Sequence, residues 1–397
     1  MSDSWVEGAA GSGFDVDHLP YGVFATPDEE PRVGVRVGDQ VVDLAPVAAA
    51  SYDVHVWLFE QPTLNVFMGT GADEWARVRS WIQDLLVDPA AEAMVGPHLV
   101  PLSEVSLRMP FEVADYADFY ASLDHASNVG KIFRPDDPAL PAAWRHLPIG
   151  YHGRAGTVVV SGTPVGRPSG QRRGSESPDF GPSQRLDIEA ELGFVVGTPS
   201  RLGRPVPASS FASHVFGVVG LNDWSARDIQ AWEYVPLGPF LGKSFATSVS
   251  AWVTPLAALD AARVDLPAQE PAPLGYLDVE QPAGFDIEVE VLLGDEVVAR
   301  PPYSSMYWGP AQMLAHLTVN GASLRTGDLF ASGTISGPEP GQRGSLLELS
   351  WGGQEPFTAA GRARTFLEDG DEVTLRYTAP SPRGHLTLGE VTGRIVS

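Results

Sequence analysis

The stretch RLDIEAELGFVVG, residues 185–197, decides the fold class. Apolar and acidic residues alternate from Leu186 to Leu192, which is the period of a β-strand with one face toward a core. The alternation places three carboxylates on one strand face at intervals of roughly 6.6 Å. They belong to Asp187, Glu189 and Glu191. A hard cation could collect two of them, if other parts of the fold supply further oxygen ligands.

The same pattern recurs in FDIEVEVLL, residues 285–293, with acids at Asp286, Glu288 and Glu290. A turn at Gly294-Asp295 follows, so we interpret this second set as the solvated face of a hairpin. Pattern alone does not separate a metal-binding face from a solvated one.

Short strand patterns separated by Gly and Pro fill the rest of the chain beyond residue 110. They lie at Thr157–Val160, Leu186–Val196, Val215–Leu221, Phe285–Arg300, Leu346–Trp351 and Glu372–Tyr377. Helical patterns are few and short there. This spacing predicts a β-rich domain and argues against a doubly wound parallel sheet.

The N-terminal part has a different organisation. Residues 32–44 alternate around a turn at Gly38-Asp39, which predicts a hairpin. Residues 72–86 carry apolar side chains at helical spacing, which predicts a helix packed on a core. The proline-rich stretch Val87–Pro110 indicates a linker or domain seam. We therefore expect two domains, residues 1–110 and 111–397.

Composition excludes several classes of function. The 397 residues carry a formal net charge of −24, which disfavours nucleic-acid and membrane partners. The absence of cysteine excludes disulfides, thiolate nucleophiles and Cys-ligated metals. No leader-like apolar segment and no run of 18 apolar residues occurs, so we expect a cytoplasmic protein. Only Lys131 and Lys243 are lysines among 26 basic residues, so a lysine could be retained for its ammonium group.

Two polar segments carry the candidate chemistry. DYADFYASLDHASNVG, residues 115–130, can form a helix with Asp118, Ser122 and His125 on one face. If residues 223–235 are helical, one stripe collects an acid, a guanidinium, an amide and a phenol. These are Asp223, Arg227, Gln230 and Tyr234. GPFLGKS, residues 238–244, lacks the first glycine of a phosphate loop, so an ATP site has no support.

These segments, together with HLPIGYHGRAGTVVVSGTP at residues 146–164 and ASGTISGPEPGQRGSLLELSW at residues 331–351, resemble the signature segments of the fumarylacetoacetase family in the same order. The resemblance implies a mainly β (α+β) fold, in which a small N-terminal SH3-like β-barrel precedes a larger β-roll catalytic domain. It implies hydrolysis of the carbon–carbon bond of 4-fumarylacetoacetate to fumarate and acetoacetate, the last step of tyrosine and phenylalanine (homogentisate) breakdown. The family is usually a homodimer.

The resemblance also implies two cation sites. A calcium ion would be held by Asp118, Glu189, Glu191 and Asp223. A magnesium ion would be held around Asp223, Lys243 and Thr247, with Lys243 contributing its main-chain oxygen. Oxygen-only ligation suits magnesium, calcium or manganese.

Catalytic and substrate-binding roles follow from the same resemblance. His125 is the implied general base, oriented by Glu348, and the implied oxyanion donors are Arg227, Gln230 and Lys243. The implied contacts to the anionic diketo-acid substrate are Tyr120, Arg134, Tyr151, Arg227, Gln230, Tyr234 and Thr334.

Two alternatives stay open. One is a related metal-dependent acylpyruvate hydrolase or oxo-acid decarboxylase acting on smaller substrates. The other is a catalytically silent metal-binding or scaffolding protein, against which the presence of His125, Glu348 and Lys243 argues. Turnover of fumarylacetoacetate discriminates among the three.

Overall fold

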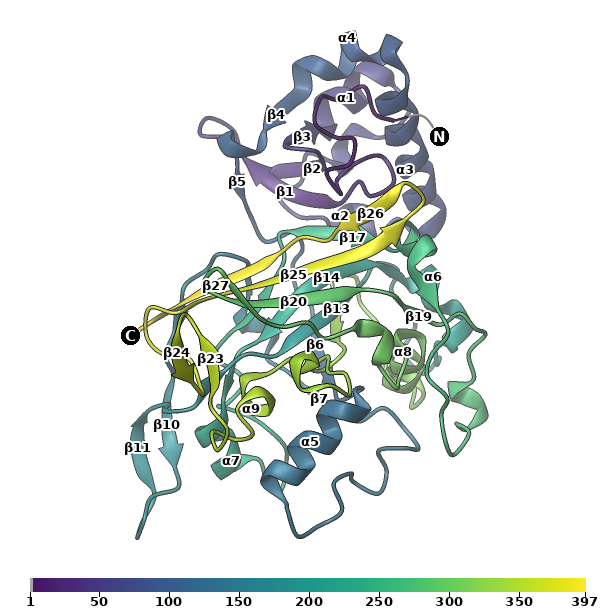
Figure 1. Ribbon diagram of the computed structural model, residues 1–397. Coiled ribbons are helices and arrows are strands. Elements are labelled where there is room, and N and C mark those ends of the chain that lie inside the picture. Colours follow the sequence, from purple (N-terminus) through teal and green to yellow (C-terminus); the bar gives the residue numbers. More distant parts are fainter. Residues whose placement is uncertain (1–2) are drawn as a thin grey trace.

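The computed structural model describes residues 3–397 and is built around one large mixed sheet (Figure 1). This sheet has 13 strands. Its main path runs β4 (Leu99–Pro101), β3 (Gln40–Asp43), β2 (Arg32–Val37), β1 (Tyr21–Ala25), β17 (Trp252–Pro255), β14 (Val215–Asp223), β13 (Ala190–Val196), β22 (Leu329–Ala331), β6 (Tyr116–Phe119) and β7 (Gly150–His152). The branches are β5 (Ser106–Leu107), β8 (Val158–Val160) and β16 (Thr247–Val249).

A second sheet of six strands includes the C-terminal strand, and most of its strands are drawn in green and yellow in Figure 1. It consists of β21 (Glu296–Ala299), β20 (Glu288–Leu293), β25 (Glu372–Ser381), β27 (Val391–Val396), β9 (Val165–Gly166) and β26 (Gly384–Thr387). Four two-stranded pairs complete the strands: β10 (Ser169–Arg172) with β11 (Asp179–Pro182), β12 (Leu186–Asp187) with β15 (Ser225–Ala226), β18 (Arg263–Val264) with β19 (Gly284–Phe285), and β23 (Phe357–Ala359) with β24 (Arg362–Arg364).

Helices are short apart from α3. The α-helices are α1 (Leu44–Ser51), α2 (Asn65–Met68), α3 (Ala72–Val87), α4 (Glu92–Val95), α5 (Leu123–Phe133), α6 (Phe211–His214), α7 (Arg227–Glu233), α8 (Pro310–Thr318) and α9 (Leu346–Leu349). The 3-10 turns are η1 (Val56–Leu58), η2 (Pro89–Ala91), η3 (Gly96–His98), η4 (Leu102–Glu104), η5 (Ala155–Thr157), η6 (Ala208–Ser210), η7 (Leu256–Ala262), η8 (Gly275–Leu277), η9 (Tyr303–Ser305) and η10 (Pro340–Gln342).

The strand-rich α+β architecture agrees with the expected fold class, but the N-terminal strands do not form the expected barrel. Among residues 3–397, β1 to β5 make no closed barrel, because β1 pairs with β17 and so joins the large sheet. The pairing matches Tyr21 with Val253 and Gly22 with Trp252. The small side chain of Gly22 is required there, since an added Cβ would lie 2.6 Å from the Trp252 ring. The stretch Val87–Pro110, predicted as a linker or domain seam, holds α4 and several short elements, so it is not an unstructured linker.

The central strands β13 and β14 are buried along their whole length. Phe194 of β13 packs into the core beneath the second sheet, whereas its neighbour Val195 packs into the core shared with the N-terminal strands. Side chains alternate between two sides of this strand, as predicted, but both sides are buried. Polar groups at the ends of β13 and β14 lie inside the protein, where they need internal partners.

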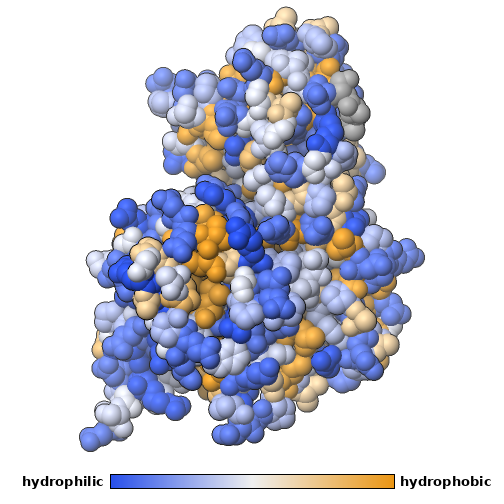
Figure 2. Space-filling model, in the orientation of Figure 1, coloured by the Kyte–Doolittle hydropathy of each residue, from blue (hydrophilic) through white to orange (hydrophobic). Residues whose placement is uncertain are grey.

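The visible surface in Figure 2 is mostly hydrophilic, with hydrophobic residues in small separated groups. This distribution agrees with the formal net charge of −24. No helix within residues 3–397 combines the length and the apolar character needed to cross a membrane.

Candidate active site

Strand pairing brings four buried carboxylates from three parts of the chain together. Glu189 precedes β13 and Glu191 lies on it, and Asp223 ends the neighbouring strand β14. Strand β22 pairs with β13 on one side and, in parallel, with β6 on the other, where Ala331 lies opposite Asp118. Ligand atoms of all four carboxylates lie within 4.8 Å of one another. They form the acidic cluster, defined as Asp118, Glu189, Glu191 and Asp223.

Two cations neutralise one side of the acidic cluster. The Lys243 ammonium donates to Glu189 and, at 2.6 Å, to Asp223. The Arg227 guanidinium donates to Glu189 at 2.7 Å and to Asp187 at 2.7 Å. Burial alone would raise the pKa of Glu189, but Lys243 and Arg227 outweigh burial and hold that pKa below its usual range.

The other side of the acidic cluster has a shortage of positive charge. Burial, together with the charge of Asp223, raises the pKa of Asp118 well above its usual range. Burial and the neighbouring Asp118 do the same to the pKa of Glu191. One oxygen of each carboxylate, Asp118 Oδ1 and Glu191 Oε1, has no hydrogen-bond partner within residues 3–397. Two unpaired buried carboxylate oxygens fit a divalent cation, so the cluster could hold a metal ion.

The remaining contacts fix the orientation of Asp223 and Glu191. Thr247 Oγ1 donates to Asp223 Oδ1 at 3.0 Å, and the Tyr151 hydroxyl donates to Asp223 Oδ2 at 3.0 Å. The Gly333 N–H donates to Glu191 Oε2 at 3.1 Å. The resemblance implied a main-chain role for Lys243, and the structure adds that its ammonium ties two strand ends together.

A histidine–glutamate pair lies beside the acidic cluster. Ser122 caps the N-terminus of α5, and His125 lies in the first turn of that helix. Its Nδ1 lies 2.6 Å from Glu348 Oε2 on α9, and its Nε2 lies 3.8 Å from Glu189 Oε1. Both side chains are buried. Burial alone would raise the pKa of Glu348, but the neighbouring His125 lowers it, so the carboxylate stays ionised.

Three local predictions for these segments are wrong. Asp118 lies on strand β6 and not on a helix with His125, because residues 116–119 pair with β22 and β7. Asp223 ends β14, so helix α7 carries only part of the expected polar stripe. The segment Leu346–Trp351 begins with helix α9 instead of a strand, since Asp187 accepts hydrogen bonds from its first two N–H groups. Asp187 therefore serves Arg227 and α9 and lies outside the acidic cluster.

A cavity of about 350 Å³ opens onto the cluster and the histidine. Predicted site residues line it: Asp118, Tyr120, His125, Arg134, Tyr151, Glu189, Arg227, Gln230, Tyr234, Lys243 and Thr334. The buried Thr334 hydroxyl oxygen has no hydrogen-bond partner within residues 3–397. The Arg227 guanidinium donates to Gln230 Oε1 at 3.1 Å, which leaves the Gln230 amide NH₂ available as a donor.

Sequence reasoning missed the apolar wall of this cavity and the groups around Glu348. The wall is formed by Val129, Phe133, Pro141, Ile149, Leu237 and Pro239. The groups that donate to Glu348, besides His125, are Asn128, Ser336 and Ser345. Helical spacing could have indicated Asn128, which follows His125 by three residues.

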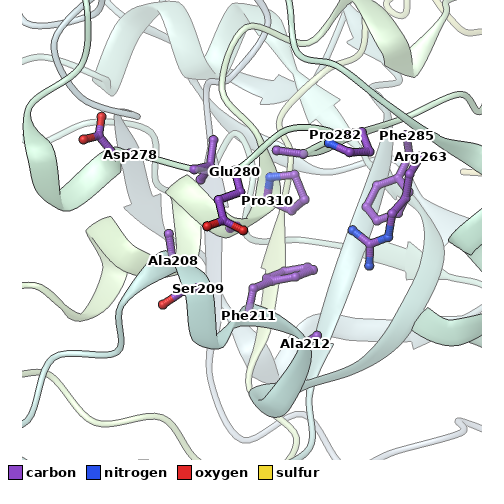
Figure 3. A pocket seen from close by; sticks show the side chains of 13 residues that line it. Ala208, Ser209, Phe211, Ala212, Arg263, Asp278, Glu280, Pro282, Phe285 and Pro310 are labelled. Atoms are coloured by element: carbon purple, nitrogen blue, oxygen red, sulfur yellow. The ribbon is translucent and has the colours of Figure 1, made fainter.

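A larger cavity of about 490 Å³ lies elsewhere, between η6, α6 and the residues from Asp278 to Phe285. Figure 3 shows the Glu280 carboxylate and the Arg263 guanidinium on different sides of it, with Phe211 between them. No member of the acidic cluster lines this cavity. Cavity size alone therefore does not select the candidate active site, and the grouping of buried ionisable residues favours the smaller cavity.

Comparison with known proteins gives matches along nearly the whole chain. Residues 115–396 match the family described as fumarylacetoacetate (FAA) hydrolase C-terminal, and residues 17–110 match the family described as fumarylacetoacetase N-terminal. The Homo sapiens fumarylacetoacetase is 45% identical over 416 residues, covering 99% of this chain and 98% of the relative. The Caenorhabditis elegans fumarylacetoacetase is 44% identical over 412 residues, covering 99% of each.

Solved structures share the fold at low sequence identity. A fumarylacetoacetate hydrolase from Exiguobacterium antarcticum has a TM-score of 0.56 at 16% identity, covering 96% of this chain and 99% of that one. A maleylpyruvate hydrolase from Sphingobium sp. SYK-6 has a TM-score of 0.54 at 16% identity, covering 95% and 99%. These likenesses bear on the fold alone.

Proposed function

Because this chain belongs to the fumarylacetoacetate hydrolase family, we propose that it hydrolyses the carbon–carbon bond of 4-fumarylacetoacetate to fumarate and acetoacetate. The observation that carries the proposal is the position of His125. Its Nδ1 lies 2.6 Å from Glu348, and its Nε2 lies 3.8 Å from Glu189 of the acidic cluster. A silent scaffold would have no need of such a buried pair facing a cavity.

His125 is the proposed general base. Its Nδ1–H donates to Glu348, which fixes the tautomer in which Nε2 carries a lone pair. At 3.8 Å from Glu189, Nε2 makes no hydrogen bond there, so the lone pair is free to accept a proton from water. The resulting hydroxide attacks the carbonyl of the fumaroyl end. The carbon–carbon bond then breaks, its electron pair passes to the acetoacetate fragment, and the proton held on Nε2 is returned to that carbon.

Charge that develops on oxygen is met by fixed donors. Gln230 lines the cavity, and its amide NH₂ remains available as a donor because its oxygen accepts from Arg227. Lys243 uses two of its three N–H groups on carboxylates and keeps one. Removing one well-placed oxyanion donor costs about 3 kcal/mol of transition-state stabilisation. A divalent cation, when bound by the acidic cluster, would supply Lewis-acid stabilisation of the enolate charge.

We further propose which cations bind and where. Calcium is assigned to the acidic cluster and magnesium to the surroundings of Asp223, Lys243 and Thr247, with manganese as a substitute. The oxygen-rich donor set and the absence of cysteine support a hard cation. Substrate contacts are assigned to Tyr120, Arg134, Tyr151, Tyr234 and Thr334, all of which line the cavity.

Several wider assignments belong to the same proposal. They are a division into domains at residue 110, a cytoplasmic homodimer, and a role in tyrosine and phenylalanine breakdown through homogentisate. The two matched regions, residues 17–110 and 115–396, support the division. The acidic surface supports the absence of nucleic-acid and membrane partners.

The proposal is tested by adding enzyme and divalent cation to fumarylacetoacetate and following the loss of its absorbance, with fumarate and acetoacetate identified as products. We expect His125→Ala to reduce turnover by about 100-fold or more, since about 100-fold is the lower end of the range for a general base. Turnover of short acylpyruvates in preference to fumarylacetoacetate would reject the substrate. Full activity of His125→Ala would reject the base.

A further inference from the structure

The two oxygens of the Glu348 carboxylate accept different numbers of hydrogen bonds. Glu348 is fully buried in the short helix α9. Its Oε2 receives three donors: His125 Nδ1 at 2.6 Å, the Ser345 hydroxyl at 2.8 Å and the Ser336 hydroxyl at 3.0 Å. All three donors act on the same oxygen, so they do not by themselves fix the rotation of the carboxylate plane.

The second oxygen, Oε1, has one side-chain donor within residues 3–397. This donor is the Asn128 amide, with Nδ2 at 3.0 Å from Oε1. Asn128 lies on α5 three residues after His125, so both side chains leave the same face of one helix. Helix α5 thus presents the imidazole to one oxygen of Glu348 and an amide to the other.

We propose that Asn128 is a positioning residue for the His125–Glu348 pair, an inference that rests on the proposed function. Its amide holds Oε1, so that Oε2 remains in line with His125 Nδ1. Without Asn128, Oε1 would be a buried carboxylate oxygen without a side-chain donor, and the carboxylate would turn to find one. The hydrogen bond that orients His125 would then lengthen or bend.

Two substitutions isolate the amide donor. Asn128→Ala removes the donor, whereas Asn128→Asp keeps the shape and sets a carboxylate against Oε1. The matched control is Ser127→Ala on the adjacent position of α5, whose side chain makes no hydrogen bond to the described part of the chain. We expect both Asn128 variants to lower kcat by about 10- to 100-fold, the range for a lost hydrogen bond to a charged group, with KM within about twofold of wild type. Ser127→Ala should match wild type.

A double-mutant cycle separates positioning from a general loss of structure. If Asn128 acts through Glu348, then Asn128→Ala in the Glu348→Gln background adds less than about a twofold further loss of kcat. Losses that multiply would overturn the proposal, as would an Asn128→Ala enzyme with the kcat of Ser127→Ala.

A measurement without substrate keeps this inference distinct from the proposed function. The His125 Nδ1–H proton, observed by NMR in histidine-labelled protein, should resonate far downfield in wild type and in Ser127→Ala. It should move upfield in Asn128→Ala and Asn128→Asp. An unchanged resonance in both Asn128 variants would overturn the positioning role. If wild-type protein fails to cleave fumarylacetoacetate, the proposed function fails, while the resonance still decides the role of Asn128.

Discussion

The scarcity of lysine in this chain indicates a specific role for Lys243. The chain has two lysines among 26 basic residues, and this scarcity indicates that a lysine could be needed for its ammonium group. One of them, Lys131, is exposed. The other is buried, and its ammonium joins Glu189 to Asp223. Burial alone would lower the pKa of Lys243, but Asp223 and Glu189 outweigh burial and raise it, so the side chain stays charged.

We therefore predict that Lys243→Met destabilises the protein and Lys131→Met does not. Removing one partner of a buried ion pair leaves an uncompensated charge, which costs about 3 kcal/mol or more in the free energy of unfolding. Urea titration of both variants measures this difference. Equal midpoints for the two variants would show that Lys243 has no special role in stability.

The acidic motifs DIEAE, residues 187–191, and DIEVE, residues 286–290, allow a controlled comparison of a glutamate inside the acidic cluster with one outside it. Glu191 lies in the acidic cluster with one unpaired oxygen, whereas Glu290 pairs with Arg300 at 2.9 Å on a hairpin. After chelation with EDTA, added Mg²⁺ or Ca²⁺ should raise the melting temperature of wild type and of Glu290→Gln. Glu191→Gln should lose most of this gain, because the cation loses a charged ligand. A uniform response in all three proteins would argue against a cation at the cluster.

Hydrophobic spacing predicted correctly those helices and strands that are held mainly by residues close in the sequence. The hairpin of β2 and β3 and the helix α3 agree with their hydrophobic spacing, because each is held mainly by near neighbours. Residues 116–119 and 346–349 were predicted wrongly, since distant partners decide them. Strand β6 depends on pairing with β22, more than 200 residues later, and α9 depends on the Asp187 carboxylate. No sequence window includes both members of either pair.

The buried His18 connects the N-terminal segment to strand β17, which is distant in the sequence. The His18 ring contacts the Gly13 carbonyl at 3.1 Å and the Thr254 hydroxyl at 2.8 Å, near the end of β17. Burial lowers the pKa of His18 to about 3. The hydrogen bond to Gly13 acts to raise this pKa, whereas the charges of Arg79 and Arg36 lower it further. In the unfolded chain the pKa of histidine is about 6.5.

This difference predicts acid sensitivity. The folded pKa is depressed, so the contribution of neutral His18 is complete above pH 6.5 and is lost as the pH falls toward 3, because the unfolded chain binds the proton first. The loss amounts to about 1.4 kcal/mol per pH unit. Between pH 7 and pH 5, the unfolding free energy of wild type should therefore fall by about 2 kcal/mol more than that of His18→Gln. Parallel pH curves for the two proteins would refute the assignment.

The members of the acidic cluster come together only in the assembled sheet. Alternation predicted the carboxylates near residue 190, but the partners Asp118 and Asp223 came from the family resemblance. They reach the cluster through the strand order β14, β13, β22 and β6, which is a property of the complete sheet. The apolar wall of the cavity is equally a product of assembly, since its residues come from several separate segments.

The pairing of β1 with β17 has a consequence for how this protein can be dissected. A cut at residue 110 would leave the backbone N–H and C=O groups of Tyr21 and Val253 without partners and would uncover Phe216 and Val219, which pack with the N-terminal strands. Such an open sheet edge is a template for intermolecular strand addition. Variants in which the N-terminal region up to residue 110 is deleted or exchanged should therefore aggregate. Fusion partners are better attached at either terminus than inserted near residue 110.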